Sequence, residues 1–183
     1  MIVVTGATGQ LGRLVIAALL KKVPASGIVA AVRNAEKARD LAASGVHVRV
    51  ADYNQPAAWD EALKGADKVL LISSSEVGQR ARQHRSVINA AGRAGVKLLA
   101  YTSVLHCDTS PLGLAVEHRE TEAMIRASGI PYTLLRNGWY TETYTAGIPG
   151  ALAHGAVYGC AGQGRIASAA RVDYAEAAAA VLT

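Results

Sequence analysis

The residues with the clearest chemical potential form a glycine-spaced loop close to the N-terminus. The loop follows the apolar run Ile2–Thr5 and reads Gly6-Ala7-Thr8-Gly9-Gln10-Leu11-Gly12. Glycine permits a tight turn at Gly6, the approach of a pyrophosphate to the backbone at Gly9, and close packing of a helix on a strand at Gly12. A helix that begins here offers free amides and a partial positive charge to phosphates. The loop predicts a dinucleotide site, and the alternative is a tight turn without a ligand.

A second chemical signal lies at the end of the next apolar run. NAD-binding domains usually carry Asp or Glu there, about 20 residues beyond the glycines, to bind the ribose 2′-hydroxyl. This chain instead has Arg33 and Asn34 after Ile28–Val32. The guanidinium of Arg33 can pair with a 2′-phosphate, which a carboxylate would repel. The position favours NADP(H), and the alternative is an ordinary surface arginine.

Three further groups of polar or aromatic residues follow apolar runs. Asp52 is expected near the adenine amino group, Ser73-Ser74-Ser75 along the cofactor crevice, and Asn137-Gly138-Trp139-Tyr140 beside the nicotinamide or a flat substrate. The carboxyl ends of parallel strands meet at one edge of a sheet, where ligands bind at the point of reversed strand order. Each group also has a simpler interpretation: an exposed loop carboxylate, a serine turn, or aromatic cover of the core.

The elements that must position these residues alternate along the chain. Short apolar runs without polar alternation indicate buried parallel strands, and the stretches between them have helical periodicity. The expected strands are Ile2–Thr5, Ile28–Val32, Val46–Val50, Lys68–Ile72, Lys97–Thr102 and Tyr132–Arg136. Helical stripes are Leu11, Leu14, Val15, Ala18 and Leu19, then His84, Ile88 and Ala91, then Thr121, Met124 and Ile125. This order predicts an α/β, Rossmann-type doubly wound parallel sheet in the order 3-2-1-4-5-6, with helices on both faces.

The composition fits one globular domain. The chain has 183 residues, of which 51% are hydrophobic and 18% charged. We expect residues 1–136 to form the NADP-binding Rossmann domain and residues 137–183 to begin a substrate-side region that is continuous with it. Glycines break up the chain after Arg136, and a last helix is expected near Asp173, with Glu176 in a variant capping box.

Charge, cysteines and hydropathy exclude several other classes. The net charge is +5, but the densest basic patch, Arg80-x-Arg82-x-x-Arg85, has no interleaved aromatic residues, so we expect a solvated helix face and no nucleic-acid partner. No apolar stretch approaches the roughly 20 residues of a membrane span. The N-terminus has no secretory signal, which indicates a cytoplasmic protein. Cys107 and Cys160 are expected to be free thiols, and no metal spacing is present.

Together these motifs resemble the NmrA-like group of atypical short-chain dehydrogenases/reductases, and most closely bacterial type 2 NAD(P)H:quinone oxidoreductases. The resemblance rests on residues 5–12, 32–34, 71–80, 100–103 and 134–140. It implies an NADPH-dependent reductase of quinones whose acceptor pocket is bounded by Thr102, Ser103, Trp139 and Tyr140. The cofactor-binding residues that it implies are Gly6, Ala7, Thr8, Gly9, Gln10, Leu11, Arg33, Ser73, Ser74, Ser75, Asn137, Gly138, Trp139 and Tyr140.

The chain departs from this pattern in two respects. Carbonyl-reducing relatives use a Tyr-x-x-x-Lys pair, and here the corresponding stretch runs from Leu114 to His118 without the tyrosine. This disfavours ordinary ketone chemistry. Ser103, His106 and His118 could each donate a proton, and the sequence assigns none of them. Family members also continue into a segment that closes over the substrate, so we expect that segment to be missing from a chain that stops at Thr183.

The rival interpretation is a sensor of the NmrA type, which binds NADP(H) and a protein partner without turnover. The sequence does not predict an oligomeric state or the physiological quinone.

Overall fold

Six parallel strands form the single sheet of this protein. The computed structural model describes all 183 residues, and its strand order is β3-β2-β1-β4-β5-β6. The strands are β1 (Ile2–Val4), β2 (Ile28–Val32), β3 (His47–Val50), β4 (Lys68–Leu71), β5 (Leu98–Val104) and β6 (Tyr132–Asn137). All six expected strands and their order are confirmed, and the ends differ by at most two residues.

Strand β1 lies at the centre, where the strand order reverses. Val3 is in register with Val29 of β2 on one side and with Val69 of β4 on the other. The chain therefore leaves β1 toward one edge of the sheet and later returns to build the other half. Because the loops after β1 and β4 diverge to opposite faces, a crevice opens at the carboxyl ends of these strands.

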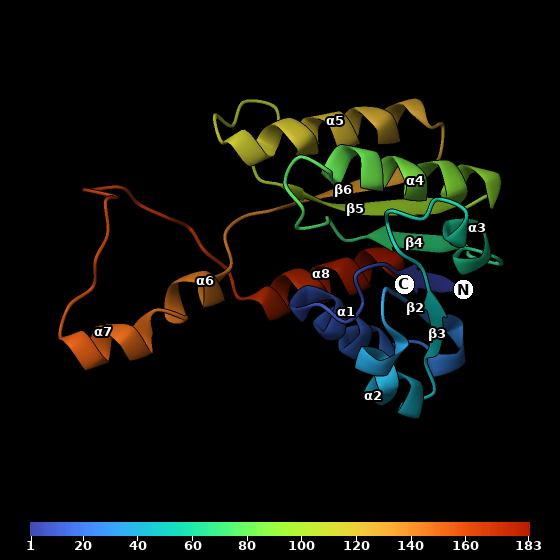
Figure 1. Cartoon of the computed structure of the whole chain (residues 1–183), viewed down its shortest axis with the longest axis horizontal. Coiled ribbons are helices and arrows are strands. Elements are labelled where there is room, and N and C mark those ends of the chain that lie inside the picture. Colours follow the sequence, from blue (N-terminus) through green and yellow to red (C-terminus); the bar gives the residue numbers. More distant parts are fainter.

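Helices cover both faces of the sheet (Figure 1). They are α1 (Gln10–Leu20), α2 (Arg39–Ala43), α3 (Ala58–Ala62), α4 (Arg80–Arg93), α5 (Gly113–Ala127), α6 (Thr141–Thr145), α7 (Ile148–His154) and α8 (Arg171–Leu182). Side chains alternate between the faces, so Ile2 and Val4 join a core with α1 and α8, whereas Val3 joins a core with α3, α4 and α5. Strands β1, β2, β4 and β5 are buried on both faces, which explains their continuous apolar runs. The edge strands β3 and β6 contain no buried residue, so the expectation of buried strands is wrong there.

The three expected helical stripes are confirmed, since they form the inner faces of α1, α4 and α5. The last helix begins earlier than expected, at Arg171. The Asp173 carboxylate accepts a hydrogen bond from the Ala170 amide at 3.2 Å, so Asp173 serves the N-terminus of α8 and Glu176 does not. Helix α8 returns to the sheet and packs along α1 through Ala175, Ala178, Ala179 and Leu182.

Helices α6 and α7 project from the body of the protein as an arm (Figure 1). Neither helix has a buried residue, and Leu152, Val157 and Tyr158 are more than three-quarters exposed.

No helix of the chain combines the length and the apolar character needed to cross a lipid bilayer.

The close contact between α1 and the preceding loop depends on Gly12. A Cβ atom at this position would lie 2.5 Å from the Gly6 carbonyl oxygen and 2.8 Å from Ala7 Cα. Both neighbours are backbone atoms, so a rotamer change cannot relieve the clash. The helix and the loop can approach one another in this way only while residue 12 has no side chain.

We therefore expect Gly12→Ala to lower the free energy of unfolding by about 1–3 kcal/mol, as overpacking does elsewhere. The matched control is Gly27→Ala, because a Cβ there meets no atom within 4 Å. Urea unfolding monitored by circular dichroism measures both variants. Equal stability of Gly12→Ala and the parent protein would show that the loop has room to move away.

Candidate functional site

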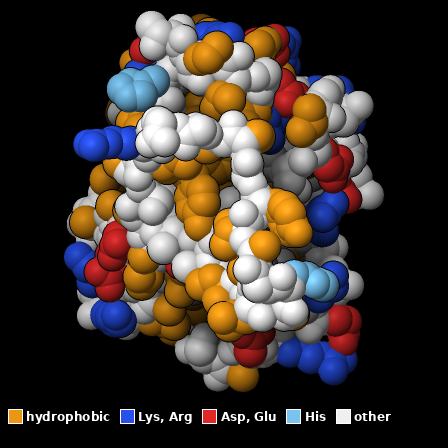
Figure 2. All heavy atoms as spheres, turned by 90° about the vertical axis from the view of Figure 1, so that its left-hand side faces the viewer, with side chains coloured by type: hydrophobic (Ala, Val, Ile, Leu, Met, Phe, Trp, Pro, Cys, Tyr) orange, Lys and Arg blue, Asp and Glu red, His pale blue; other side chains and the backbone are white.

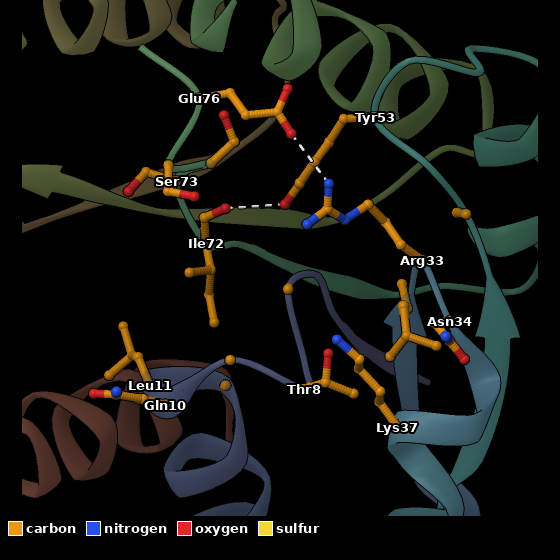
Figure 3. A pocket seen from close by; sticks show the side chains of 18 of the residues that line it. Thr8, Gln10, Leu11, Arg33, Asn34, Lys37, Tyr53, Ile72, Ser73 and Glu76 are labelled. Carbon is orange, nitrogen blue, oxygen red and sulfur yellow. Dashed lines mark hydrogen bonds and ion pairs between the residues drawn. The ribbon is translucent and has the colours of Figure 1, made fainter.

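A cavity of about 420 Å³ lies at the carboxyl ends of β1, β2 and β4 (Figure 3). It brings together the glycine loop, Arg33 and the serine run, which come from three separate strand ends. The lining residues are Gly6, Thr8, Gly9, Gln10, Leu11, Gly12, Ala31, Val32, Arg33, Asn34, Lys37, Ala51, Tyr53, Trp59, Ile72, Ser73, Ser74, Ser75 and Glu76. We call this space the first cavity.

The N-terminus of α1 opens into the first cavity. Gly9 caps the helix without a side-chain hydrogen bond, and the first turn contains no acidic residue. The amides of Gln10, Leu11 and Gly12 donate to no other group of the chain. Three free donors and the positive end of the helix dipole thus face the same space, which is the arrangement that binds phosphate groups.

Buried polar groups form hydrogen bonds with the backbone of the serine run, Ser73-Ser74-Ser75. The Ser73 amide donates to Thr102 Oγ1 at 2.8 Å, and the Ser74 amide donates to His84 Nε2 at 3.0 Å. The Ser74 carbonyl accepts from Arg80 Nε at 2.8 Å. Ser73 and Ser74 therefore have fixed backbone positions at the edge of the cavity, although they belong to a loop.

The comparison with protein families agrees with this geometry. A family model described as NAD(P)H-binding matches residues 6–183, almost the whole chain. The chain belongs to the NAD(P)H-binding family.

The chain is also similar to named relatives and to solved structures. It is 66% identical over its whole length to quinone oxidoreductase 2 of Escherichia coli, and it spans 64% of that relative's length. The crystal structure of that NADPH-dependent quinone oxidoreductase with NADPH superimposes with a TM-score of 0.97, with 100% of this chain and 65% of the other covered. Citrobacter sp. triphenylmethane reductase with NADP(H) gives a TM-score of 0.97 at 48% identity, covering 100% of this chain and 66% of the other.

The residues of the first cavity fit an NAD(P)H molecule. Ser74 Oγ is buried at its wall and has no hydrogen-bond partner within the protein, as expected of a group that a ligand completes. A Cβ atom at Gly9 would lie 3.1 Å from the Gly6 carbonyl oxygen, so the loop is already closely packed. Arg33 and Lys37 supply positive charge at the opposite end from the serine run (Figure 3).

A second cavity, of about 860 Å³, adjoins the first at Ser73, which lines both. Its wall includes Thr102 and Ser103 of β5, together with the loop Asn137–Tyr140. The loop is held by α8, because the Gly138 amide donates to the Tyr174 hydroxyl at 3.1 Å. On the side from which the α6–α7 arm projects, hydrophobic side chains gather around a hollow (Figure 2).

Ser103 in the second cavity is already engaged. Its hydroxyl donates to Glu122 Oε1 at 2.5 Å, and the same carboxylate accepts from Arg136 and Arg126. Burial of Glu122 opposes ionisation, but the hydrogen bonds from Arg136, Ser103 and Arg126 outweigh it and lower the pKa to about 2. A permanently ionised carboxylate holds the Ser103 proton, so Ser103 has no proton left to donate into the cavity.

His118 also lines the second cavity, and it remains available as a donor. Tyr101 Oη lies 2.6 Å from His118 Nδ1. Burial raises the pKa of Tyr101, and burial together with the nearby Arg80 charge lowers the pKa of His118 to about 4. Both groups are neutral near pH 7. If the Tyr101 hydroxyl donates to Nδ1, the ring proton of His118 lies on Nε2, which has no hydrogen-bond partner in the protein.

His84 is a second neutral histidine, and its role is to support the serine run. Because the Ser74 amide donates to Nε2, Nδ1 carries the ring proton and donates to Thr121 Oγ1 at 3.0 Å. Burial, with smaller contributions from Arg80 and His118, lowers the pKa of His84 to about 3. A proton on Nε2 would break the bond to the Ser74 amide, so the neutral ring is part of the site's geometry.

The structure distributes the expected site residues over both cavities. The glycine loop, Arg33 and the serines surround the first cavity, with the exception of Ala7, which is buried beneath it. Asn137, Gly138, Trp139 and Tyr140 line only the second cavity. Asp52 lines neither, because its carboxylate closes a turn by accepting from the Asn54 amide at 2.8 Å.

One basic residue was interpreted incorrectly. Arg80 is only 7% exposed and pairs with Glu117 at 3.0 Å, so the expected solvated face of α4 is wrong at this position. Sequence reasoning also missed Lys37, Tyr53 and Glu76, which line the first cavity. Lys37 could have been predicted, because it is a second basic residue only four positions after Arg33. Nothing local to Tyr53 or Glu76 indicates that the fold brings them to Arg33.

The two neutral histidines predict a pH-dependent stability. In the unfolded chain a histidine takes up a proton near pH 6.5, whereas folded His118 and His84 do so only near pH 4 and 3. Between these values the unfolded state binds more protons, so the free energy of unfolding falls as the pH falls. From pH 7 to pH 5 we expect a loss of about 1–2 kcal/mol for each histidine.

Denaturant unfolding across this pH range measures the slope. His84→Gln, whose amide can still accept from Ser74, should reduce the slope by about half. The same substitution at the exposed His47 is the matched control and should leave it unchanged. An unaltered slope in His84→Gln would contradict the assignment of a neutral buried ring.

Proposed function

We propose that this protein is an NADPH-dependent oxidoreductase that transfers a hydride to quinones. The observation that carries the proposal is the junction of the two cavities at Ser73, which joins the space lined by the glycine loop and Arg33 to the one lined by Trp139 and Tyr140. The similarity to quinone oxidoreductase 2 over the whole chain supports it. The chain spans 64% of that relative's length.

The preference for NADPH rests on the charges of the first cavity. Arg33 and Lys37 both line its β2 side, and no carboxylate occupies the position after β2 that would bind a ribose 2′-hydroxyl. A guanidinium and an ammonium together suit a 2′-phosphate. The amides at the start of α1 would hold the pyrophosphate, and Ser74 Oγ would gain the partner that it lacks.

The second cavity suits a flat, electron-poor acceptor. Trp139 and Tyr140 offer aromatic faces, and Leu105, Leu112 and Ile166 add apolar surface. When bound, the reduced nicotinamide supplies the hydride, so the protein has to bind, orient and exclude water. A quinone accepts hydride without a strong acid, which is compatible with the absence of the tyrosine of the Tyr-x-x-x-Lys pair.

His118 would assist the acceptor as a hydrogen-bond donor. The neutral ring can donate Nε2–H to a quinone oxygen and stabilise the negative charge that develops there. Tyr101 keeps the donor on Nε2 by occupying Nδ1. Of the three donors considered from the sequence, Ser103 is engaged with Glu122. His106 and His118 both line the second cavity, but His106 is exposed to solvent, whereas His118 is buried.

The proposal also includes a cytoplasmic location. Cys107 and Cys160 are both free thiols, as is usual in a reducing compartment. The rival function, a sensor that binds NADP(H) without turnover, has the same first cavity and is distinguished only by assay.

The deciding experiment follows NADPH absorbance at 340 nm with and without 1,4-benzoquinone. We expect steady oxidation that requires the quinone. Tight NADPH binding without quinone-dependent oxidation would contradict the enzyme and favour the sensor.

For the cofactor preference, Arg33→Ala should weaken NADPH binding about 10- to 100-fold, the effect of losing a charge-assisted hydrogen bond. NADH binding should change little, because NADH has no 2′-phosphate. Arg39→Ala, an exposed arginine outside the cavity, is the matched control. Equal losses for both nucleotides in a fluorescence titration would contradict the role of Arg33.

For the acceptor side, His118→Leu should lower kcat for benzoquinone by roughly 10- to 100-fold, because it removes one donor to a developing charge. The Kd for NADPH should be nearly unchanged. His154→Leu, on the exposed arm, controls for loss of a histidine. An unchanged kcat in His118→Leu would remove His118 from the mechanism.

A further inference from the structure

The guanidinium of Arg33 already has an anionic partner. Arg33 Nη1 donates to Glu76 Oε1 at 3.1 Å, although the two residues are 43 positions apart in the chain. Arg33 follows β2 and Glu76 lies in the loop after β4, so their ion pair crosses the first cavity from one wall to the other (Figure 3). Any phosphate that binds Arg33 has to meet this carboxylate.

Glu76 is held in place by a second contact. Its other oxygen, Oε2, accepts from Gln83 Nε2 at 2.7 Å. Gln83 belongs to α4 and is only 1% exposed, so it is a rigid support. The carboxylate is therefore fixed toward Arg33, unlike that of a free surface glutamate, which can turn away into solvent.

Few other cationic side chains near the first cavity can bind a phosphate in place of Arg33. Arg13, the other arginine near this end, is paired with Asp40 and donates to the Lys37 carbonyl. Lys37 lines the cavity and points into it beside Thr8 (Figure 3). A 2′-phosphate can therefore pair with Lys37, and it can pair with Arg33 only in competition with the Glu76 carboxylate.

From this geometry we propose that Glu76 limits the preference for NADPH over NADH by competing with the 2′-phosphate for Arg33. The competition lowers the affinity for NADPH and leaves the affinity for NADH unaffected, so the protein discriminates less strongly between the two nucleotides than Arg33 alone would. The inference rests on the proposed role of Arg33 in the function above. Gln83 acts as a positioning residue, because it orients the carboxylate.

The expected size of the effect follows from exposure. The Arg33 and Glu76 side chains are 63% and 42% exposed, and solvent screens such pairs strongly. Removing the negative charge should therefore strengthen phosphate binding by about two- to five-fold rather than by orders of magnitude.

The test uses two probes that isolate the 2′-phosphate, adenosine 2′,5′-bisphosphate and adenosine 5′-monophosphate, measured by isothermal titration calorimetry. Glu76→Gln keeps the shape of the side chain and removes its charge. It should bind the bisphosphate about two- to five-fold more tightly and the monophosphate with unchanged affinity. In an Arg33→Ala background the gain should disappear. Glu120→Gln, an exposed residue of α5, controls for the change in net charge.

Three results would overturn the inference: no gain in Glu76→Gln, an equal gain for both probes, or a gain that persists without Arg33. The last would mean that Glu76 repels the phosphate directly. If Arg33→Ala alone does not weaken bisphosphate binding, the NADPH preference proposed above fails as well. A normal loss in Arg33→Ala with no gain in Glu76→Gln overturns the role of Glu76 alone.

Discussion

The central position of β1 between β2 and β4 is the constraint from which the site follows. Both neighbours are parallel to β1, so the chain has to cross one face of the sheet to build the first half and the other face to build the second. The crossovers separate directly above the carboxyl ends of β1 and β4. Thr5 and Ile72 lie at this separation, and Tyr53 Oη connects them through contacts of 2.8 Å to Thr5 Oγ1 and 3.0 Å to the Ile72 carbonyl oxygen. Burial raises the pKa of Tyr53 to about 12, which keeps this connection protonated and uncharged.

The site combines polar groups that have no hydrogen-bond partner in the protein with supporting groups whose hydrogen bonds are all made within it. The α1 amides and Ser74 Oγ lack partners, whereas Glu117, Glu122 and Arg136 are engaged by several hydrogen bonds each. Because the supporting groups are satisfied within the protein, they fix the loops at the edge of the sheet without competing for a ligand. Arg33 and Glu76 are the exception, since they satisfy one another across the opening.

The sequence predicted the fold and the glycine loop well because these depend on local signals. Apolar runs such as Ile28–Val32 identify strands wherever both faces of a sheet are covered, and glycine spacing identifies the loop. The start of α8 was misjudged because Asp173 can serve either as the cap or as the third residue of the helix. Arg80 and Glu76 were misjudged or missed for another reason. Their partners, Glu117 and Arg33, lie 37 and 43 positions away, and no local pattern encodes such a pairing.

The proposed function requires the two cavities that meet at Ser73 to hold NADPH and its acceptor side by side. A crystal structure of the protein with NADP⁺ tests it most directly. We expect the 2′-phosphate beside Arg33, the pyrophosphate at the amides of Gln10 to Gly12, and the nicotinamide at Ser73, facing the cavity of His118 and Trp139. A nucleotide bound in the opposite orientation, or with its nicotinamide turned away from the second cavity, would contradict the claim.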